Sequence, residues 1–177
     1  DYSAIPNDGI DDYQGITNAI EAAKGLGTAA RILFENGEYI LSNRLTIDNA
    51  THDIILEGGT DTRFTMTNRD AGFLFVGHSK NAIVKNFTID YDPLPFTQGT
   101  VSSITSNYFV LNVDPGYPDD NEFCSLGPTF GVIHDPNIPG RIKQNTFTHY
   151  NVSSAVRIGP GQLRVYTTER PIEVGDR

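Results

Sequence analysis

The chain has only one cysteine, Cys124, among its 177 residues, so no disulfide can form within it. Phe123 and Leu126 lie close to it in the sequence, which predicts that this cysteine packs as a small buried apolar side chain. A role as a nucleophile would need a histidine and an orienting acid beside it. The chain also has no apolar run near the roughly 18 residues that a membrane span needs, so we expect no membrane partner.

The first four residues contain neither a basic stretch nor an apolar one, so no signal peptide is predicted there. Basic residues are scarce throughout, since 13 Lys and Arg stand against 22 Asp and Glu and the net charge is −9. Phosphate backbones bind to a basic face, so nucleic acid is not an expected partner. The same field repels acidic ligands and favours neutral ones, unless a local Lys/Arg cleft overrides it.

One helix is predicted, near the start of the chain. Asp11 or Asp12 caps it, and it runs to about Lys24, with glycines at 25 and 27 ending it. Its apolar residues recur at three- and four-residue spacing, which predicts one buried stripe. The stripe consists of Ile16, Ala19, Ile20 and Ala23.

Short β-runs separated by Asn, Gly, Asp or Ser follow this helix. They are predicted at residues 31–34, 39–41, 45–47, 54–56, 63–66, 73–76, 82–84 and 87–89. Runs this short do not make a sandwich core, but they suit the faces of a coil in a stacked repeat. Ile32 and Ile54 lie 22 residues apart, and Ile54 and Ile83 lie 29 apart, or about one coil each. The alternative is an ordinary antiparallel β-domain with short strands.

The pattern changes near Pro93. Runs at 99–104 and 108–113 flank a turn at 105–107, which indicates a hairpin. Longer alternating runs favour antiparallel pairing with one wet face. They lie at 131–134, 144–152, 155–158 and 162–167. Residues 98–174 therefore predict a small β-lobe inserted between coils, and the chain divides into residues 1–97 and 98–177.

Three motifs in the first 60 residues resemble pectate-lyase-like right-handed parallel β-helix proteins. Asp8-Gly9-Ile10-Asp11-Asp12 is similar to the motif that begins their capping helix, with one residue fewer before the acid pair. Phe34 through Tyr39 is similar to their Phe-Pro-x-Gly-x-Tyr turn, with Glu35 in place of proline, and Leu56-Glu57-Gly58 to their Leu-x-Gly. The resemblance implies a right-handed parallel β-helix with an N-terminal capping helix and an inserted small antiparallel β-lobe.

Residues 86–99 and 134–143 resemble segments of secreted β-helix proteins among, or close to, the glycoside hydrolases. In those proteins the solenoid continues well beyond the corresponding point. The resemblance implies an extracellular glycoside hydrolase that acts on a polysaccharide or oligosaccharide, with this chain as its N-terminal part and with catalytic coils that can lie outside it. The alternatives are a non-catalytic glycan-binding, adhesin or tailspike-type module, and a polysaccharide lyase. The oligomeric state is not predicted.

Asp90 and Asp92 are the best local acid pair for such chemistry. Glycoside hydrolysis uses two carboxyl groups, about 5–5.5 Å apart for retention and 6.5–9.5 Å for inversion. Acids at positions i and i+2 of a strand project on one side about 6.5 Å apart, while Tyr91 between them faces the other way. The structural alternative is that Asp92 ends a strand before Pro93 and that Asp90 bonds to backbone or to the lobe.

Substrate contacts are predicted for Tyr91, Phe96, Arg63 and His78, which could stack on or hydrogen-bond to a sugar. Tyr108, Tyr117 and Tyr150 are further candidates for stacking. A lyase would use carboxylates with Ca²⁺ and an Arg or Lys base, for which Arg63 and Lys85 are candidates. Three sequons, at Asn49, Asn86 and Asn151, are candidates for glycosylation and agree with secretion.

No metal site is predicted. Asp8, Asp11 and Asp12 are close enough in sequence to suggest a calcium cluster, but helix capping and turn formation explain them more simply. No cofactor is expected, and Ca²⁺ enters only in the lyase alternative.

Overall fold

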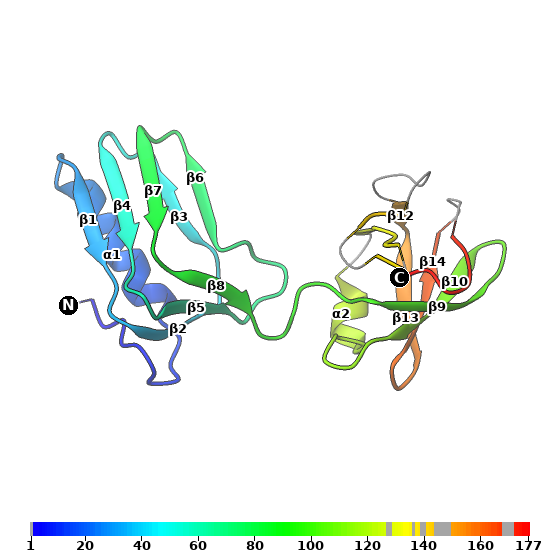
Figure 1. The fold of residues 1–177 in the computed structure, drawn as a ribbon. Helices are drawn as coiled ribbons and strands as arrows, with labels where there is room; N and C mark the ends of the chain where they lie inside the picture. The colour runs from blue at the N-terminus through cyan, green and yellow to red at the C-terminus, as the bar shows by residue number, and fades with distance from the viewer. Residues whose placement is uncertain (1, 127–128, 136, 139–140, 144–149, 168–171) are drawn as a thin grey trace. The chain divides into compact units, whose positions relative to one another are not determined.

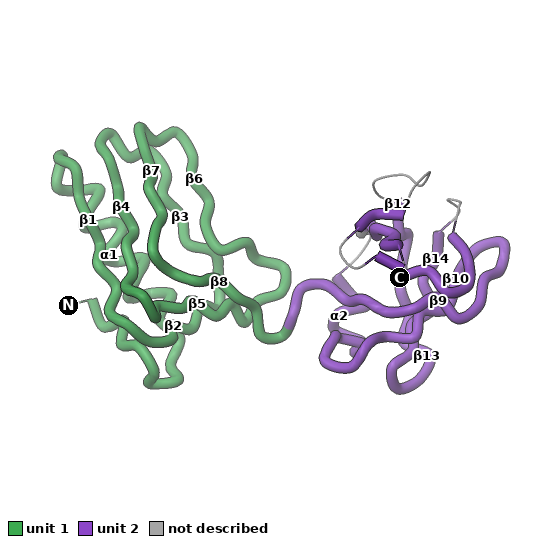
Figure 2. Tube along the Cα trace, viewed as in Figure 1, with its two compact units in different colours: residues 1–93 green, residues 94–177 purple. Residues whose placement is uncertain are grey.

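The computed structural model describes residues 2–126, 129–135, 137–138, 141–143, 150–167 and 172–177. The chain forms two compact units, Asp1–Pro93 and Leu94–Arg177 (Figure 2). The division predicted from the sequence, between residues 97 and 98, lies a few residues further along the chain. The structure is mainly β, and each unit has its own apolar core.

The first unit contains one helix and eight short strands (Figure 1). They are α1 (Tyr13–Gly25), β1 (Ala30–Leu33), β2 (Gly37–Leu41), β3 (Leu45–Asp48), β4 (Asp53–Glu57), β5 (Thr62–Met66), β6 (Leu74–Gly77), β7 (Asn81–Lys85) and β8 (Thr88–Tyr91). The strands form three parallel sheets, ordered β1-β4-β7, β2-β5-β8 and β3-β6. Consecutive strands therefore enter the three sheets in turn, and β4 returns to lie beside β1. All eight predicted β-runs are confirmed as strands.

The parallel register overturns the antiparallel alternative for these strands and corrects the spacing predicted between them. Ile54 pairs with Ala30 on one side and with Ala82 on the other, so the steps are 24 and 28 residues. The sequence predicted 22 and 29 because it matched isoleucines rather than paired positions. The sheet β2-β5-β8 repeats more regularly, since Arg63 pairs with Glu38 and with Thr88, at steps of 25 residues.

The core of the first unit is built from the inward-facing residues of all three sheets and from α1. Ile16 and Ile20 of the helix are each 1% exposed, and Ala19 and Ala23 are also buried, which confirms the predicted stripe. Phe64 on β5 is completely buried at the centre of an aromatic cluster. Its ring centroid lies 4.8–5.3 Å from those of four other rings. They belong to Phe34, Tyr39, Phe73 and Phe87.

Residues 7–12, which we call the N-terminal strap, close the free edge of β2. The backbone N–H groups of Glu38, Ile40 and Ser42 all face this edge. They donate to Asn7 Oδ1 (3.0 Å), Asp12 Oδ2 (3.0 Å) and Asp11 Oδ1 (3.0 Å), respectively. An open strand edge invites pairing with another chain, and the strap removes that edge with side-chain acceptors.

The prediction that Asp12 caps α1 is therefore wrong for its side chain. Asp12 occupies the N-cap position but makes no capping bond. Its carboxylate instead accepts from the N–H of Ile5 (2.9 Å) and that of Ile40, and only 3% of the residue is exposed. Burial raises the pKa of this carboxyl group above its usual value, against the effect of the two backbone hydrogen bonds. The turn-forming roles of the other two acids are confirmed, since Asp8 accepts from Ile10 N and Asp11 from Tyr13 N.

The second unit contains two antiparallel sheets, ordered β13-β14-β10-β9 and β11-β12. Its elements are β9 (Gly99–Ile104), β10 (Tyr108–Val113), α2 (Asn121–Ser125), β11 (Thr129–Gly131), β12 (Tyr150–Val152), β13 (Ser154–Gly159) and β14 (Gln162–Tyr166). The predicted hairpin is confirmed as β9 and β10. Of the run predicted at 144–152, residues 144–149 lie outside the described residues, and β12 covers the last three.

The helix α2 was missed by the sequence analysis, which predicted only one helix. It has five residues, and Asp120 caps it by accepting from Phe123 N at 2.7 Å. Cys124 lies on this helix, half-buried against the core of the second unit, and desolvation raises the pKa of its thiol. The cysteine therefore packs against the core but is less buried than the sequence predicted.

The two ends of the second unit lie side by side. Val101 N, on the first strand β9, donates to Asp176 O at 2.8 Å, and Gly175 N donates to Val101 O at 2.8 Å. Lys143 Nζ fixes this end by pairing with Asp176 (2.6 Å) and Glu173 (2.7 Å). The chain thus enters and leaves this unit at neighbouring positions.

Acid is expected to destabilise the second unit through two carboxyl groups. A hydrogen bond from Gly161 N and the Arg157 guanidinium lower the pKa of Asp119 below 3.8, and Lys143 lowers that of Glu173 below 4.5. Because a lowered folded-state pKa favours the ionised form, this contribution is full above pH 4.5 and is lost as the pH falls through the lowered values. Hydrogen exchange of residues 94–177 between pH 6 and pH 3 measures it. Asp119→Asn should flatten the profile, whereas the exposed Glu122→Gln should not, and identical profiles would contradict the assignment.

Candidate functional site

Three charged side chains form a row across the sheet β2-β5-β8, one from each strand. Arg63 on β5 lies between Glu38 on β2 and Asp90 on β8. Arg63 Nη2 is 2.6 Å from Asp90 Oδ2, and Arg63 Nε is 4.0 Å from Glu38 Oε1. Thr65 Oγ1 donates to the same Glu38 oxygen at 2.5 Å. We call Glu38, Arg63 and Asp90 the charged row.

Strand alternation places the charged row on the outer face of the sheet. Tyr39 and Leu41 of β2 and Phe64 and Met66 of β5 face inward and are 3% exposed or less. Because successive side chains of a strand point to opposite faces, Glu38 and Arg63 must face outward. The aromatic and aliphatic residues that build the core therefore also fix the row.

The charged row is open to solvent. Its side chains are 49%, 49% and 43% exposed for Glu38, Arg63 and Asp90, respectively. Exposed ion pairs contribute roughly 0–1 kcal/mol to stability, so folding alone gives little reason for three of them to line up. The row offers acceptor, donor and acceptor groups in sequence, which suits a ligand with several hydroxyl groups.

The geometry of the charged row favours binding over acid catalysis by these groups. Strands two apart in a sheet are separated by about 9.6 Å. Glu38 and Asp90 also lie diagonally across the row, since Asp90 pairs with Thr65 and Glu38 with Arg63. The guanidinium of Arg63 occupies the space between them. A retaining pair would instead need two carboxyl groups about 5–5.5 Å apart.

Of the predicted site residues, the structure brings together only Arg63 and Asp90. Asp92 lies beyond the end of β8, where it is exposed, and its N–H donates to Met66 O at 3.0 Å. Tyr91 packs against the core, and its hydroxyl donates to Ala71 O at 2.9 Å. This contact anchors the loop before β6.

The other predicted residues lie elsewhere. His78 follows β6 with a positive φ, its side chain is 80% exposed, and its Nδ1 is 3.0 Å from Asp48 Oδ1. Phe96 belongs to the second unit, where its ring centroid is 5.7 Å from that of Tyr117. Tyr150 is a core residue whose pKa burial raises to about 12, which argues against stacking on a sugar. The sequon residues Asn49, Asn86 and Asn151 are exposed.

Sequence reasoning missed Glu38 and Thr65. It also had no link between Arg63 and an acid, because the partners lie 25 and 27 residues away in sequence. That spacing is one coil of the sheet, so a correct repeat length would have aligned Glu38, Arg63 and Asp90. Lys85 has a partner of the same kind. Its Nζ is 3.2 Å from Glu57, which also pairs with Arg31 at 3.1 Å.

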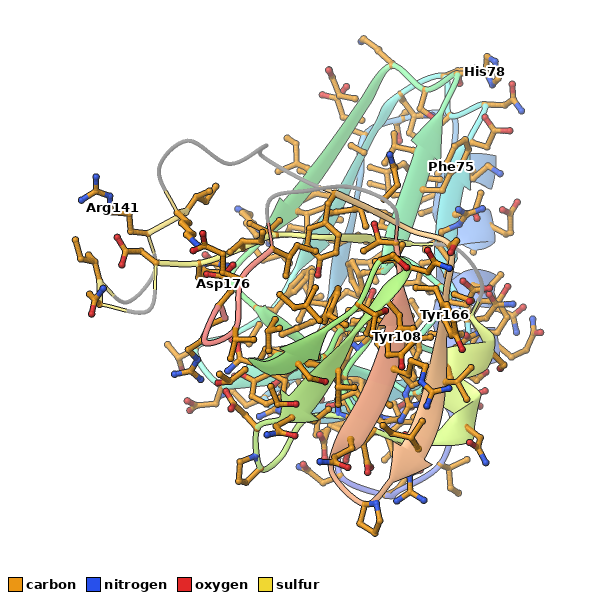
Figure 3. The ribbon with its side chains drawn as sticks, turned by 90° about the vertical axis from the view of Figure 1, so that its right-hand side faces the viewer. Phe75, His78, Tyr108, Arg141, Tyr166 and Asp176 are labelled. Atoms are coloured by element: carbon orange, nitrogen blue, oxygen red, sulfur yellow. The ribbon has the colours of Figure 1, made fainter. Side chains whose placement is uncertain are left out.

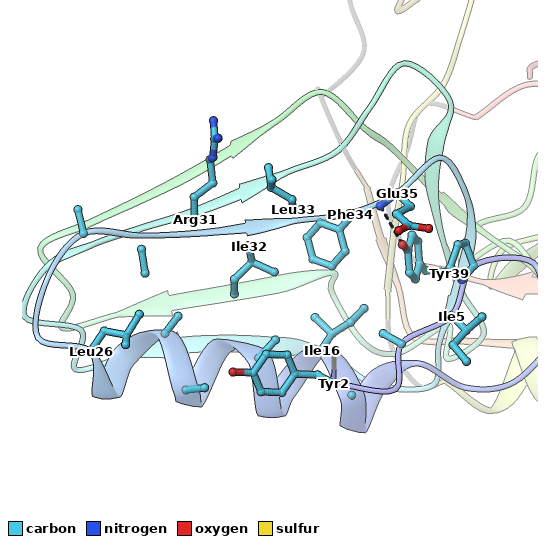
Figure 4. A pocket seen from close by; sticks show the side chains of 18 residues that line it. Tyr2, Ile5, Ile16, Leu26, Arg31, Ile32, Leu33, Phe34, Glu35 and Tyr39 are labelled. Atoms are coloured by element: carbon cyan, nitrogen blue, oxygen red, sulfur yellow. Dashed lines mark hydrogen bonds between the residues drawn. The ribbon is translucent and has the colours of Figure 1, made fainter.

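A cleft of about 760 Å³ lies between α1 and β1 (Figure 4). Its walls are mostly small or apolar, with Ala19, Ala23 and Ile32 among them, and Arg31 and Glu35 are its charged residues. Glu35 takes part through its backbone N–H, which donates to the Tyr39 hydroxyl at 3.0 Å. None of the predicted site residues lines the cleft, so we place the candidate site on the charged row.

Within the described residues, no group of three or more His, Cys, Asp or Glu side chains is arranged to hold a metal ion. Among the described helices, none is long and apolar enough to span a membrane. Known protein families and curated proteins offer no match to the chain. The charged row is therefore interpreted from its own geometry.

Proposed function

We propose that this chain belongs to a secreted carbohydrate-active protein with a right-handed parallel β-helix, and that its charged row contacts a polysaccharide. The observation that carries the proposal is the row itself, in which Arg63 lies between two exposed carboxylates on an outer sheet face. Outer faces of stacked strands hold side chains rigidly, which a binding site requires. Alternating acceptors and donors match the hydroxyl groups of a neutral glycan.

The β-helix part of the proposal draws support from the three parallel sheets and from the last coil. Val76, Val84 and Ile89 occupy the same inward positions as the completely buried Ile47, Leu56 and Phe64 of the preceding coil. They are nevertheless 41–46% exposed. A further coil stacked on β6, β7 and β8 would cover them. The neighbouring ends of Leu94–Arg177 fit a unit inserted between two coils.

For the whole protein, the proposed activity is glycoside hydrolysis, which the sequence resemblance implies, with Asp90 and Asp92 as the hypothetical acid pair. A non-catalytic glycan-binding module is the second candidate, because Asp90 is engaged by Arg63 rather than by a second carboxyl group. Turnover of a glycan panel by the full-length protein decides between them. Products that absorb in the ultraviolet would identify a lyase, and activity that survives both Asp90→Asn and Asp92→Asn would exclude these residues as the acid pair.

Loss of the central cation is expected to weaken glycan binding by the charged row. Arg63→Gln removes the donor between two acceptors and should reduce affinity about tenfold, which corresponds to about 1.4 kcal/mol. Affinity electrophoresis against a panel of soluble neutral polysaccharides measures the change. Arg31→Gln is the matched control, since Arg31 is an exposed, ion-paired arginine on the sheet β1-β4-β7. If both variants migrate like the wild type with every polysaccharide that binds, the row is not the site.

A further inference from the structure

A second polar surface lies on the outer face of the sheet β13-β14-β10-β9. Phe109, Leu163 and Val165 face the core and are 2%, 0% and 7% exposed. Alternation therefore turns Tyr108, Arg164 and Tyr166 to the opposite face. Tyr108 pairs directly with Tyr166, and Arg164 lies two residues before Tyr166 on β14. We call these three residues the Tyr–Arg platform, and Figure 3 labels its two tyrosines.

The platform holds a guanidinium group in place without a carboxylate. Arg164 Cζ lies 4.8 Å from the ring centroid of Tyr108, and the two tyrosine centroids are 5.6 Å apart. Arg164 also hydrogen-bonds to the side chain of Tyr166, while its buried Nε–H has no acceptor. The cation is thus oriented by a ring face and a phenol.

The lack of an acid near Arg164 is unusual in this chain. Acidic residues outnumber basic ones by 22 to 13, and Arg31, Arg63, Arg157 and Arg177 all pair with carboxylates. Among the described residues that the register places on this face, none is acidic. They are Thr100, Ser103, Tyr108, Val110, Asn112, Ser154, Val156, Gln162, Arg164 and Tyr166.

We propose that the Tyr–Arg platform binds an anionic polysaccharide, through the carboxylate or sulfate group of a sugar unit. A guanidinium fork matches either anion, and tyrosine rings offer an apolar surface to a sugar ring. Asn112 and Gln162, hydrogen-bonded to each other at 3.0 Å, place amide groups on the same face for neighbouring hydroxyls. The platform has one base and no acid, whereas the charged row has two acids and one base. The two surfaces therefore differ in the ligands that they favour.

Alginate, a polyuronate, is the first probe, with its carboxyl-reduced neutral form as the matched ligand. Isothermal titration with the full chain at low ionic strength should show binding to alginate at least tenfold tighter than to the reduced polymer. Arg164→Gln should abolish that difference, and Arg164→Lys should restore part of it because the charge returns. Carrageenan in a parallel titration tells whether sulfate replaces carboxylate, since an Arg164-dependent affinity for it identifies the sulfate ester as a ligand.

Two control variants separate this proposal from others. Arg157→Gln removes a cation from the adjacent strand β13, where Asp119 already pairs with it, and should leave alginate affinity within twofold. Arg63→Gln should also leave it unchanged, so failure of the charged row and failure of the platform can be told apart. If Arg164→Gln retains a native circular dichroism spectrum and the wild-type affinity for both anionic polymers, the platform only stabilises the sheet and the proposal is overturned. Failure of the wild type to bind either polymer overturns it as well.

Discussion

Phe64→Ala is expected to cost about 3–5 kcal/mol in the free energy of unfolding of the first unit. The Phe64 ring is completely buried, and four aromatic rings surround it, so its removal leaves a cavity that several coils share. Small domains are commonly stable by about 5–15 kcal/mol, so a loss of this size is a large part of the total. Hydrogen exchange of residues 2–93 in increasing urea measures the loss.

Phe75→Ala is the matched control because it removes the same side chain from the outer face of β6. Phe75 is 41% exposed, and its main contact is the guanidinium of Arg44, 5.2 Å from the ring centroid. A cation–π contact at such a site contributes about 0.5–1 kcal/mol. Exchange in residues 94–177 should stay unchanged in both variants, since the chain forms two separate compact units. Equal losses for Phe64→Ala and Phe75→Ala would show that the aromatic cluster does not hold the coils together.

Local patterns in the sequence predicted most of the first unit, because its strands and helix are set by nearest neighbours. The stripe that includes Ile16 and Ile20 is a property of a single helix, and each β-run is bounded by its own turn residues. The length of a coil, in contrast, depends on how many residues each turn uses. The turns differ, so Ile54 pairs with Ala30 rather than with Ile32. A register fixed by turns cannot be derived from matching isoleucines.

The charged row was out of reach for the same reason. Arg63 and Asp90 were each recognised as candidates, but they lie 27 residues apart, and only the register brings them together. Glu38 lies in a motif that resembles a turn, and its outward position follows from the burial of Tyr39. The five-residue helix α2 was missed because it is too short for a periodic pattern and depends on the cap from Asp120.

The motifs behind the family resemblance have physical explanations in the structure. A side chain at Gly58 would bring its Cβ within 2.6 Å of Asn86 O on the next coil. At Gly37, where φ is 132°, a Cβ would lie 2.4 Å from Asn7 Nδ2 in the N-terminal strap. Both glycines therefore allow neighbouring backbone segments to approach, and the second one connects the turn before Tyr39 with the acid motif at the start of the chain.

Asp12→Ala is expected to destabilise the first unit by about 3 kcal/mol. The Asp12 carboxylate is almost fully buried and accepts from the N–H groups of Ile5 and Ile40. Without it, two partly buried donors lose their acceptor, and each such donor costs about 1–3 kcal/mol. Removal of a buried charge offsets part of this cost. Asp12→Asn keeps one acceptor oxygen and should therefore lie between the wild type and alanine.

Asp8→Ala is the control within the same motif. Asp8 is exposed and accepts a single hydrogen bond, from Ile10 N at 2.8 Å, so its loss should cost less than about 1 kcal/mol. Urea unfolding of both variants, followed by hydrogen exchange at the amides of Ile5 and Ile40, separates the two acids. If the motif acted only by capping α1, Asp12→Ala would speed exchange in the first turn of the helix and leave Ile40 protected. The strap instead requires that Ile40 lose protection first, because its amide bonds directly to the carboxylate that is removed.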